Sequence, residues 1–174
     1  MKEDLEGNIE EMKKYLKKLD ESGLYDAEKY SRSLLHQTSQ LSYFYCSIVK
    51  DGSPSDTYYH VHKRPKEHQM AYFNIGRGFP KELMDGHWCY VVKDLGYKML
   101  IIPCTSIKKE SSPVNPHFEK DLTVLDDHGM ITHSRMQLTD LRTVDIQRLD
   151  CRKPFYNVCD DQEEIRKFII EHLF

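Results

Sequence analysis

The sequence predicts an α+β protein in which two N-terminal helices precede a small, strongly bent antiparallel β-barrel and a closing helix. Three observations support this fold class. Apolar residues recur at helical spacing through the first 50 residues, short aromatic and β-branched segments follow from residue 70, and helical spacing returns after residue 160. We therefore divide the chain into a helical extension with its linker, residues 1–66, and a barrel domain, residues 67–174.

The first 50 residues are expected to form a helical hairpin. One helical stripe comprises Leu5, Ile9, Met12, Leu16 and Leu19. A second comprises Ala27, Tyr30, Leu34, Leu41, Tyr45 and Ile48. Gly23 is suited to end the first helix, and Asp26 is suited to cap the start of the second. Such a hairpin cannot bury both stripes alone, so it must pack on the rest of the chain or on a second subunit.

The barrel strands are expected within residues 70–76, 87–93, 98–104 and 121–125, which are short, β-branched or aromatic and bounded by turn residues. Residues 51–69 are predicted to be a connector with a short strand at Tyr58–His62. Asp160 and Glu163 form a candidate capping box for the last helix. Its apolar face would comprise Ile165, Phe168, Ile169 and Leu173.

Composition narrows the function classes. The net charge of −3 excludes a basic protein that coats nucleic acid, so any RNA contact must come from a local groove. No apolar run is long enough for a membrane span, and the acidic start does not resemble a signal peptide, so we expect a cytoplasmic protein without a membrane partner. The five cysteines form no CxxC pair and are expected to be free thiols, mostly buried.

The segment Ser134–Leu149, SRMQLTDLRTVDIQRL, resembles the C-terminal signature of the MazF/PemK/Kid toxins. The matching residues are Leu141, Arg142, Thr143, Val144, Asp145, Arg148 and Leu149. Two further segments resemble family landmarks in the same order: AYFNIGRGFPKE, which ends in Glu82, and IIPCTSIKK, which carries Thr105 and Ser106. The resemblance covers about residues 70–150 and leaves the N-terminal helices without a counterpart.

This resemblance implies an SH3-like barrel of the MazF and CcdB kind, a homodimer, and single-stranded RNA bound across the dimer. It also implies a toxin endoribonuclease that cuts mRNA sequence-specifically without a metal or other cofactor and is neutralised by a cognate antitoxin. CcdB poisons DNA gyrase on the same fold. The alternative is therefore a non-catalytic toxin or regulator that binds a protein target.

Three residues are predicted to be catalytic. A metal-free ribonuclease must take the 2′-hydroxyl proton, stabilise charge on the phosphorus, and protonate the leaving 5′-oxygen. His87 is the candidate for proton transfer, since histidine changes charge near neutral pH. Counted without a gap from Glu82, it occupies the position where many members of the family carry an Arg. Thr105 and Ser106 are small hydroxyl donors at a predicted strand end and match the family's catalytic step.

The remaining candidates bind RNA or support the fold. The predicted RNA-binding residues are Arg77, Lys81, Glu82, Trp88, Lys108 and Ser134. The loop with Gly76 and Gly78 is a plausible mobile lid over RNA. Trp88 would stack on a base if it is exposed, or otherwise belong to the core. Arg142, Asp145 and Arg148 are predicted to form a structural ion-pair network.

No metal site is predicted, because His60, His62 and His68 lack a fourth ligand at a usual spacing. The helical extension leaves two possibilities open. It is either an added packing or oligomerisation element, or a module that restrains the barrel within the same chain.

Overall fold

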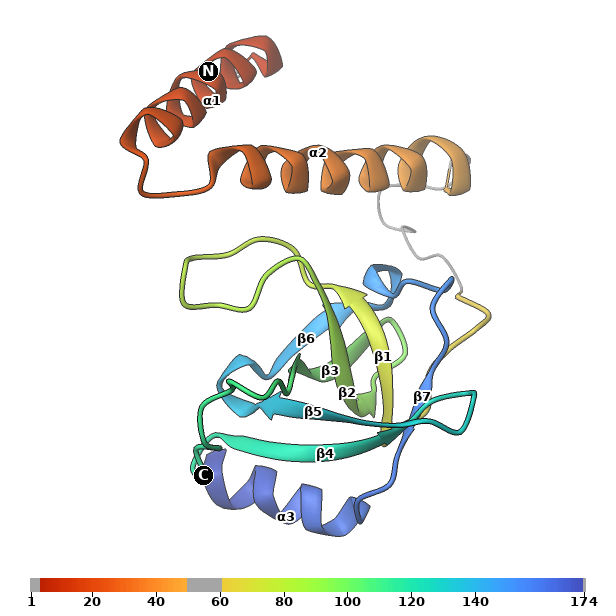
Figure 1. The fold of residues 1–174 in the computed structure, drawn as a ribbon. Helices are drawn as coiled ribbons and strands as arrows, with labels where there is room; N and C mark the ends of the chain where they lie inside the picture. Colours follow the sequence, from red (N-terminus) through yellow and green to blue (C-terminus); the bar gives the residue numbers. More distant parts are fainter. Residues whose placement is uncertain (1–3, 50–60, 174) are drawn as a thin grey trace. The chain divides into compact units, whose positions relative to one another are not determined.

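The computed structural model describes residues 4–49 and 61–173. The chain divides between residues 57 and 58 into two compact units. It contains an N-terminal helical unit and an antiparallel barrel with a C-terminal helix (Figure 1), which confirms the predicted α+β class. No helix among the described residues is long and apolar enough to cross a membrane.

The helical unit contains α1 (Leu5–Ser22), α2 (Ala27–Tyr43) and a π-helical turn, η1 (Phe44–Ile48). Both predicted caps are confirmed. Gly23 ends α1 at φ 62°, in the left-handed region that favours glycine, and the Asp26 side chain accepts a hydrogen bond from the Lys29 amide at 2.8 Å. Only Ala27 and Phe44 are buried in these elements. The first apolar stripe is mostly exposed, whereas the second is mostly buried or half-buried.

The barrel is built from six antiparallel strands. They are β1 (Gln69–Asn74), β2 (Gly86–Asp94), β3 (Lys98–Ser106), β4 (Glu119–Leu125), β5 (Ile131–Gln137) and β7 (Tyr156–Val158). Their order is β2-β1-β7-β4-β5-β3, and pairing of β2 with β3 closes the ring. A short strand, β6 (Arg142–Asp145), adds to β3 beside β5. The expected strand at Tyr58–His62 falls largely outside the described residues.

Two cores lie on opposite faces of β1, β2 and β3. One draws on all six strands of the ring and is therefore the barrel interior; its largest members include Met70, Tyr90, Ile102, Leu122 and Met136. The second forms around Phe73, Ile101 and Ile146, and is closed by β6 and the 3-10 turn η3 (Ile146–Arg148). Successive side chains along each strand point to opposite faces, so the same strands contribute residues to both cores.

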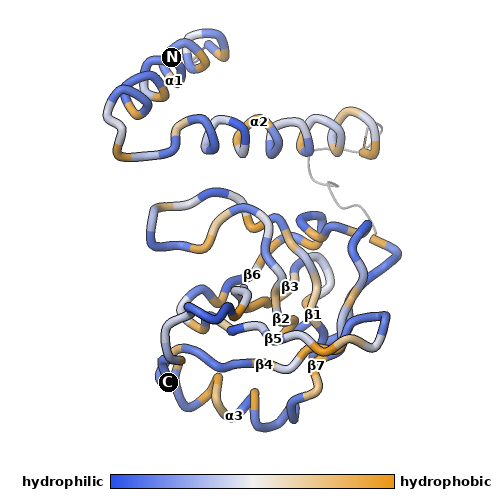
Figure 2. The backbone as a smooth tube through the Cα atoms, viewed as in Figure 1, coloured by the Kyte–Doolittle hydropathy of each residue, from blue (hydrophilic) through white to orange (hydrophobic). Residues whose placement is uncertain are grey.

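Helix α3 (Gln162–Leu173) covers the barrel beside β4, with its hydrophobic side toward the strands (Figures 1 and 2). Ile165 and Ile169 belong to the interior core. The predicted capping box is wrong by one residue. Asp161 accepts hydrogen bonds from the amides of Glu163 and Glu164, both at 2.9 Å, whereas Asp160 accepts from the Thr123 amide of β4. Asp160 therefore fastens the start of the helix to the sheet.

The five cysteines are free, as expected, but they are not mostly buried. Cys89 and Cys104 are buried, while Cys46, Cys151 and Cys159 are exposed. Burial raises the pKa of Cys104 to about 12 and that of Cys89 well above its usual value. Partial desolvation and the neighbouring Asp150 carboxylate raise the pKa of Cys151.

Thiol labelling tests this distribution. A raised pKa leaves less thiolate at neutral pH, and thiolate is the reactive form. At pH 7.5 we expect Ellman's reagent to label Cys46 and Cys159 first and Cys151 more slowly. Cys89 and Cys104 should react only after denaturation. Rapid reaction of all five thiols in the folded protein would contradict the burial of the two barrel cysteines.

Truncation in the barrel interior tests the core. Leu122 is fully buried, so Leu122→Ala should lower the free energy of unfolding by about 2–5 kcal/mol in a denaturant titration. Leu95→Ala is the matched control, because Leu95 is half-exposed in the β2–β3 turn. This variant should lower the free energy of unfolding by no more than about 0.5 kcal/mol. Equal losses for the two variants would contradict the assignment of the interior.

Candidate functional site

The first feature of the candidate site lies where β2 and β3 separate. Their last registered pair at this end is Cys89 opposite Pro103. Beyond it, Nδ1 of His87 lies 3.2 Å from the carbonyl oxygen of Cys104. Because a carbonyl can only accept, a hydrogen bond here requires the proton on Nδ1. In the neutral ring, the lone pair is then on Nε2.

The same contact places His87 beside Thr105. The carbonyl that it approaches belongs to the peptide bond joining Cys104 to Thr105. The structure therefore brings two of the three predicted catalytic residues to one corner of the barrel. Ser106 is the last residue of β3, is exposed, and lies opposite Ser134 of β5. Three strands thus contribute to this corner.

Thr105 lies in a polar network that crosses three strands. Nε2 of Gln137 donates to Oγ1 of Thr105 at 3.4 Å and to Oε1 of Glu119 at 3.1 Å. In the register, Gln137 of β5 lies opposite Glu119 of β4. Since the Thr105 hydroxyl accepts from Gln137, its own proton remains available for a further acceptor.

Arg135, which was not predicted, anchors this network. Its side chain is only 9% exposed and donates to both oxygens of Asp121, at 2.7 and 3.1 Å. It also donates to the Ser112 carbonyl at 2.6 Å and lies 3.7 Å from Glu119. Asp121 raises the pKa of Arg135, so the guanidinium stays charged. Arg135 therefore ties the loop after β3 to the face that carries Thr105.

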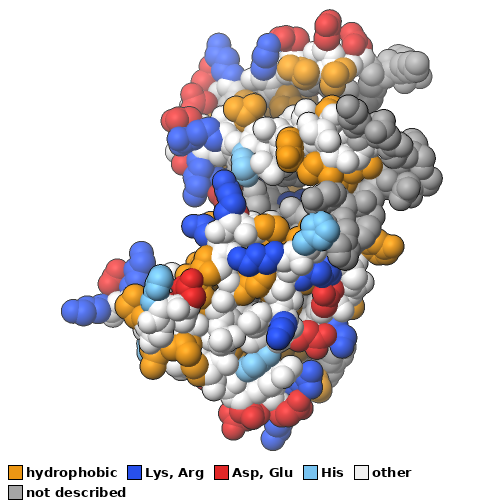
Figure 3. All heavy atoms as spheres, turned by 90° about the vertical axis from the view of Figure 1, so that its right-hand side faces the viewer, with side chains coloured by type: hydrophobic (Ala, Val, Ile, Leu, Met, Phe, Trp, Pro, Cys, Tyr) orange, Lys and Arg blue, Asp and Glu red, His pale blue; other side chains and the backbone are white. Residues whose placement is uncertain are grey.

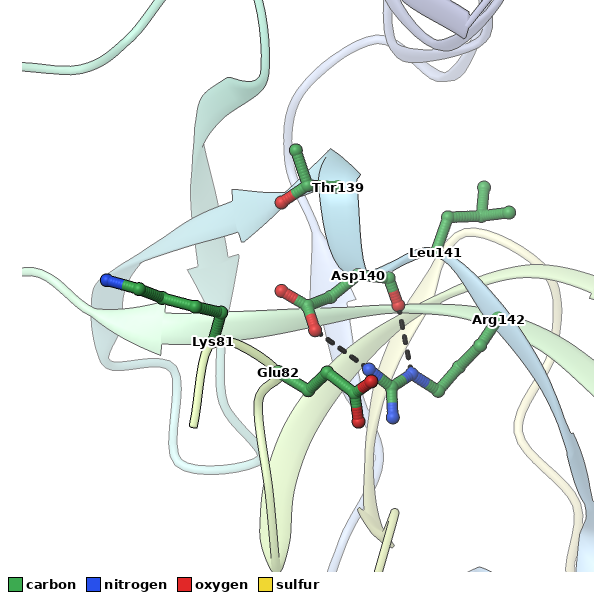
Figure 4. A pocket seen from close by; sticks show the side chains of 6 residues that line it. All are labelled: Lys81, Glu82, Thr139, Asp140, Leu141 and Arg142. Atoms are coloured by element: carbon green, nitrogen blue, oxygen red, sulfur yellow. Dashed lines mark hydrogen bonds and ion pairs between the residues drawn. The ribbon is translucent and has the colours of Figure 1, made fainter. Parts of the chain in front are cut away.

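The second feature is a pocket of about 430 Å³ between the β1–β2 loop and the end of β5 (Figure 4). It is lined by Lys81, Glu82, Thr139, Asp140, Leu141 and Arg142. Gln137 of the Thr105 network immediately precedes η2 (Leu138–Asp140), so the two features flank the same turn.

Asp140 holds this pocket together. Its Oδ1 accepts from the Leu83 amide at 2.9 Å and from Nη2 of Arg142 at 2.8 Å, while Nε of Arg142 donates to the Asp140 carbonyl at 3.2 Å. Lys81 extends away from this ion pair in Figure 4. One carboxylate thus fixes both the loop and the guanidinium.

The β1–β2 loop is closed at its base. The amide of Asp85 donates to the Gly76 carbonyl at 2.6 Å, and the Ile75 amide donates to Asp85. Nε of Arg77 lies 2.9 Å from Asp85, close enough for an ion pair but without hydrogen-bond alignment. The Arg77 side chain is 7% exposed, so the ion pair lies inside the loop. Arg77 therefore supports the loop and does not present its charge to solvent.

Two other predicted residues make contacts outside the Thr105 network. Trp88 is on the opposite face of β2 from His87; it stacks on Tyr156 with ring centroids 4.4 Å apart and packs against the interior core. Lys108 is exposed after β3, where its amide donates to Ser111. No group of three or more potential metal ligands occurs in residues 4–49 and 61–173; His60 lies outside them.

Arg142, Asp145 and Arg148 make separate structural contacts instead of a shared network. Arg142 pairs with Asp140. Asp145 accepts from the Gln147 amide at 2.9 Å, and Arg148 donates to the Asn74 carbonyl at 3.1 Å. These contacts fasten β6, η3 and the end of β1 to one another.

No protein-family model matches the chain, and a search of characterised proteins finds no significant match. Functional assignment therefore depends on the motifs of residues 70–150 and on the geometry of the barrel.

Replacing Asp140 tests the loop anchor. Asp140→Ala removes the acceptor of the Leu83 amide and leaves Arg142 without its carboxylate. We expect faster hydrogen exchange at Leu83, by tenfold or more, and a loss of about 1–3 kcal/mol in the free energy of unfolding. Thr139 lines the same pocket, so Thr139→Ala is the control and should leave exchange at Leu83 unchanged. Unchanged exchange at Leu83 in the Asp140 variant would contradict an anchoring role.

Proposed function

We propose that this chain is a toxin endoribonuclease of the MazF/PemK type, with an SH3-like barrel, that cleaves single-stranded RNA without a metal. The observation that carries the proposal is the contact of His87 Nδ1 with the Cys104 carbonyl, next to Thr105 in the chain, because this contact leaves the lone pair of the neutral ring on Nε2. The motif resemblance over residues 70–150 supports the same family. A cytoplasmic location, a homodimer and a cognate antitoxin belong to this proposal.

The proposed reaction uses the nucleophile that RNA carries. Nε2 of His87 takes the proton of the 2′-hydroxyl, whose oxygen attacks the adjacent phosphorus. The bond from phosphorus to the 5′-oxygen breaks, that oxygen takes a proton from a water molecule, and the imidazolium of His87 later loses its proton to solvent. The products are a 2′,3′-cyclic phosphate and a 5′-hydroxyl. A general base of this kind contributes typically 10²–10⁴-fold to the rate.

Thr105 is assigned to stabilise the negative charge that develops on the phosphate. The Thr105 oxygen accepts a hydrogen bond from Gln137, so the Thr105 hydroxyl can donate its own hydrogen bond to a phosphate oxygen. Arg135 does not serve this purpose, since Asp121 and Glu119 neutralise it. The positive charge that RNA requires would come from Lys108 and Lys81, which are exposed.

Cleavage in EDTA tests the proposal. Wild-type protein should cut a long single-stranded RNA at discrete sites and leave 2′,3′-cyclic phosphate ends. His87→Gln keeps a polar side chain but has no group that can transfer a proton, so the rate should fall by about 10²–10⁴-fold. His133→Gln, on an exposed position of β5, should retain wild-type activity.

Two outcomes count against the proposal. Wild-type rates in His87→Gln would remove the proton-transfer role. No cleavage by the folded wild-type protein would instead favour the alternative, a non-catalytic toxin or regulator that binds a protein such as gyrase.

A further inference from the structure

Within the helical unit, helix α1 presents an apolar stripe that is not buried against α2. Leu5, Ile9, Met12, Leu16 and Leu19 follow a 4-3-4-3 spacing, which places them within about 80° of the helix circumference at 100° per residue. No residue of α1 is buried, and Ile9 and Met12 are 43% and 47% exposed. Such a repeat is typical of helices that pair along a shared seam.

The charged residues of α1 are segregated along its length. Acidic residues Glu6, Glu10 and Glu11 occupy the first half, the basic residues Lys13, Lys14, Lys17 and Lys18 follow, and the acidic Asp20 and Glu21 lie in the last turn. Two copies of the helix side by side in parallel would bring like charges together. An antiparallel pair centred on Ile9 and Met12 would bring the acidic first half of each helix against the lysine segment of the other, so charge favours that orientation.

We infer that α1 is a self-association surface, which pairs antiparallel with α1 of a second copy of this chain. In the favoured register, Ile9 packs beside Met12 of the second copy, and Leu5 beside its Leu16. Glu6 then lies on the same flank as Lys13 of the second copy, and the contact occurs twice by symmetry.

Helix α2 carries further exposed apolar residues. A pair of 18-residue helices is marginal by itself in water. Leu35 and Leu41 of α2 are also exposed, at 71% and 51%. On the helical unit in Figure 3, hydrophobic side chains are exposed among charged ones of both signs. Two helical units together can therefore cover the stripes that one leaves open, independently of the proposed ribonuclease activity.

The molar mass of the full chain tests the surface. We expect Ile9→Glu/Met12→Glu to raise the dissociation constant for self-association at least tenfold in sedimentation equilibrium, whether or not the barrel also dimerises. Leu24→Glu is the matched control, because Leu24 is exposed between the helices and lies off the stripe. A monomeric wild type, or an unchanged dissociation constant in the double variant, would overturn the inference.

Charge exchange tests the orientation with surface changes that leave the stripe intact. Glu6→Lys and Lys13→Glu should each weaken association several-fold, and the double variant should restore it, because both antiparallel contacts are then reversed. Raising the salt concentration should weaken association of the wild type. Failure of the double variant to recover, or association strengthened by salt, would overturn the antiparallel arrangement. Helical content by circular dichroism verifies that each variant is folded.

Discussion

The barrel depends on the double pairing of β3. One edge of this strand pairs with β2, and the other pairs first with β6 and then with β5. The β2 edge closes the ring, while the shift from β6 to β5 bends the sheet so that it can close. Two cores result, since the same strands present alternate residues to the interior and to the face covered by β6 and η3.

The candidate site arises where that pairing ends. After Cys89 and Pro103, β2 and β3 no longer pair, and His87 bonds to a β3 carbonyl that the ladder leaves available. Beside it, Thr105 is held through Gln137, and Arg135 secures the next loop. Nδ1 of His87 makes the contact that supports the fold, and Nε2 remains for proton transfer. His87 is therefore the best candidate for the general base.

Sequence patterns predicted the elements whose signal is local. Gly23 and Asp26 were identified because capping depends on neighbouring residues, and β1 to β4 because their apolar character is dense. Strands β6 and β7 are too short for a periodic signal. The role of Arg135 was not predicted, because its ion pair depends on the strand register that places it opposite Asp121, and no local sequence pattern gives that register. Trp88 was resolved as a core residue only by its contact with Tyr156 across the sheet.

The tautomer of His87 tests the central claim most directly. Long-range ¹H–¹⁵N correlation of the imidazole at a pH where the ring is neutral distinguishes the two nitrogens. The account predicts a protonated, hydrogen-bonded Nδ1 and an unprotonated Nε2. A proton on Nε2 with a bare Nδ1 would mean that the Cys104 carbonyl is not bound and that the basic lone pair faces the strand, which would contradict the proposed site.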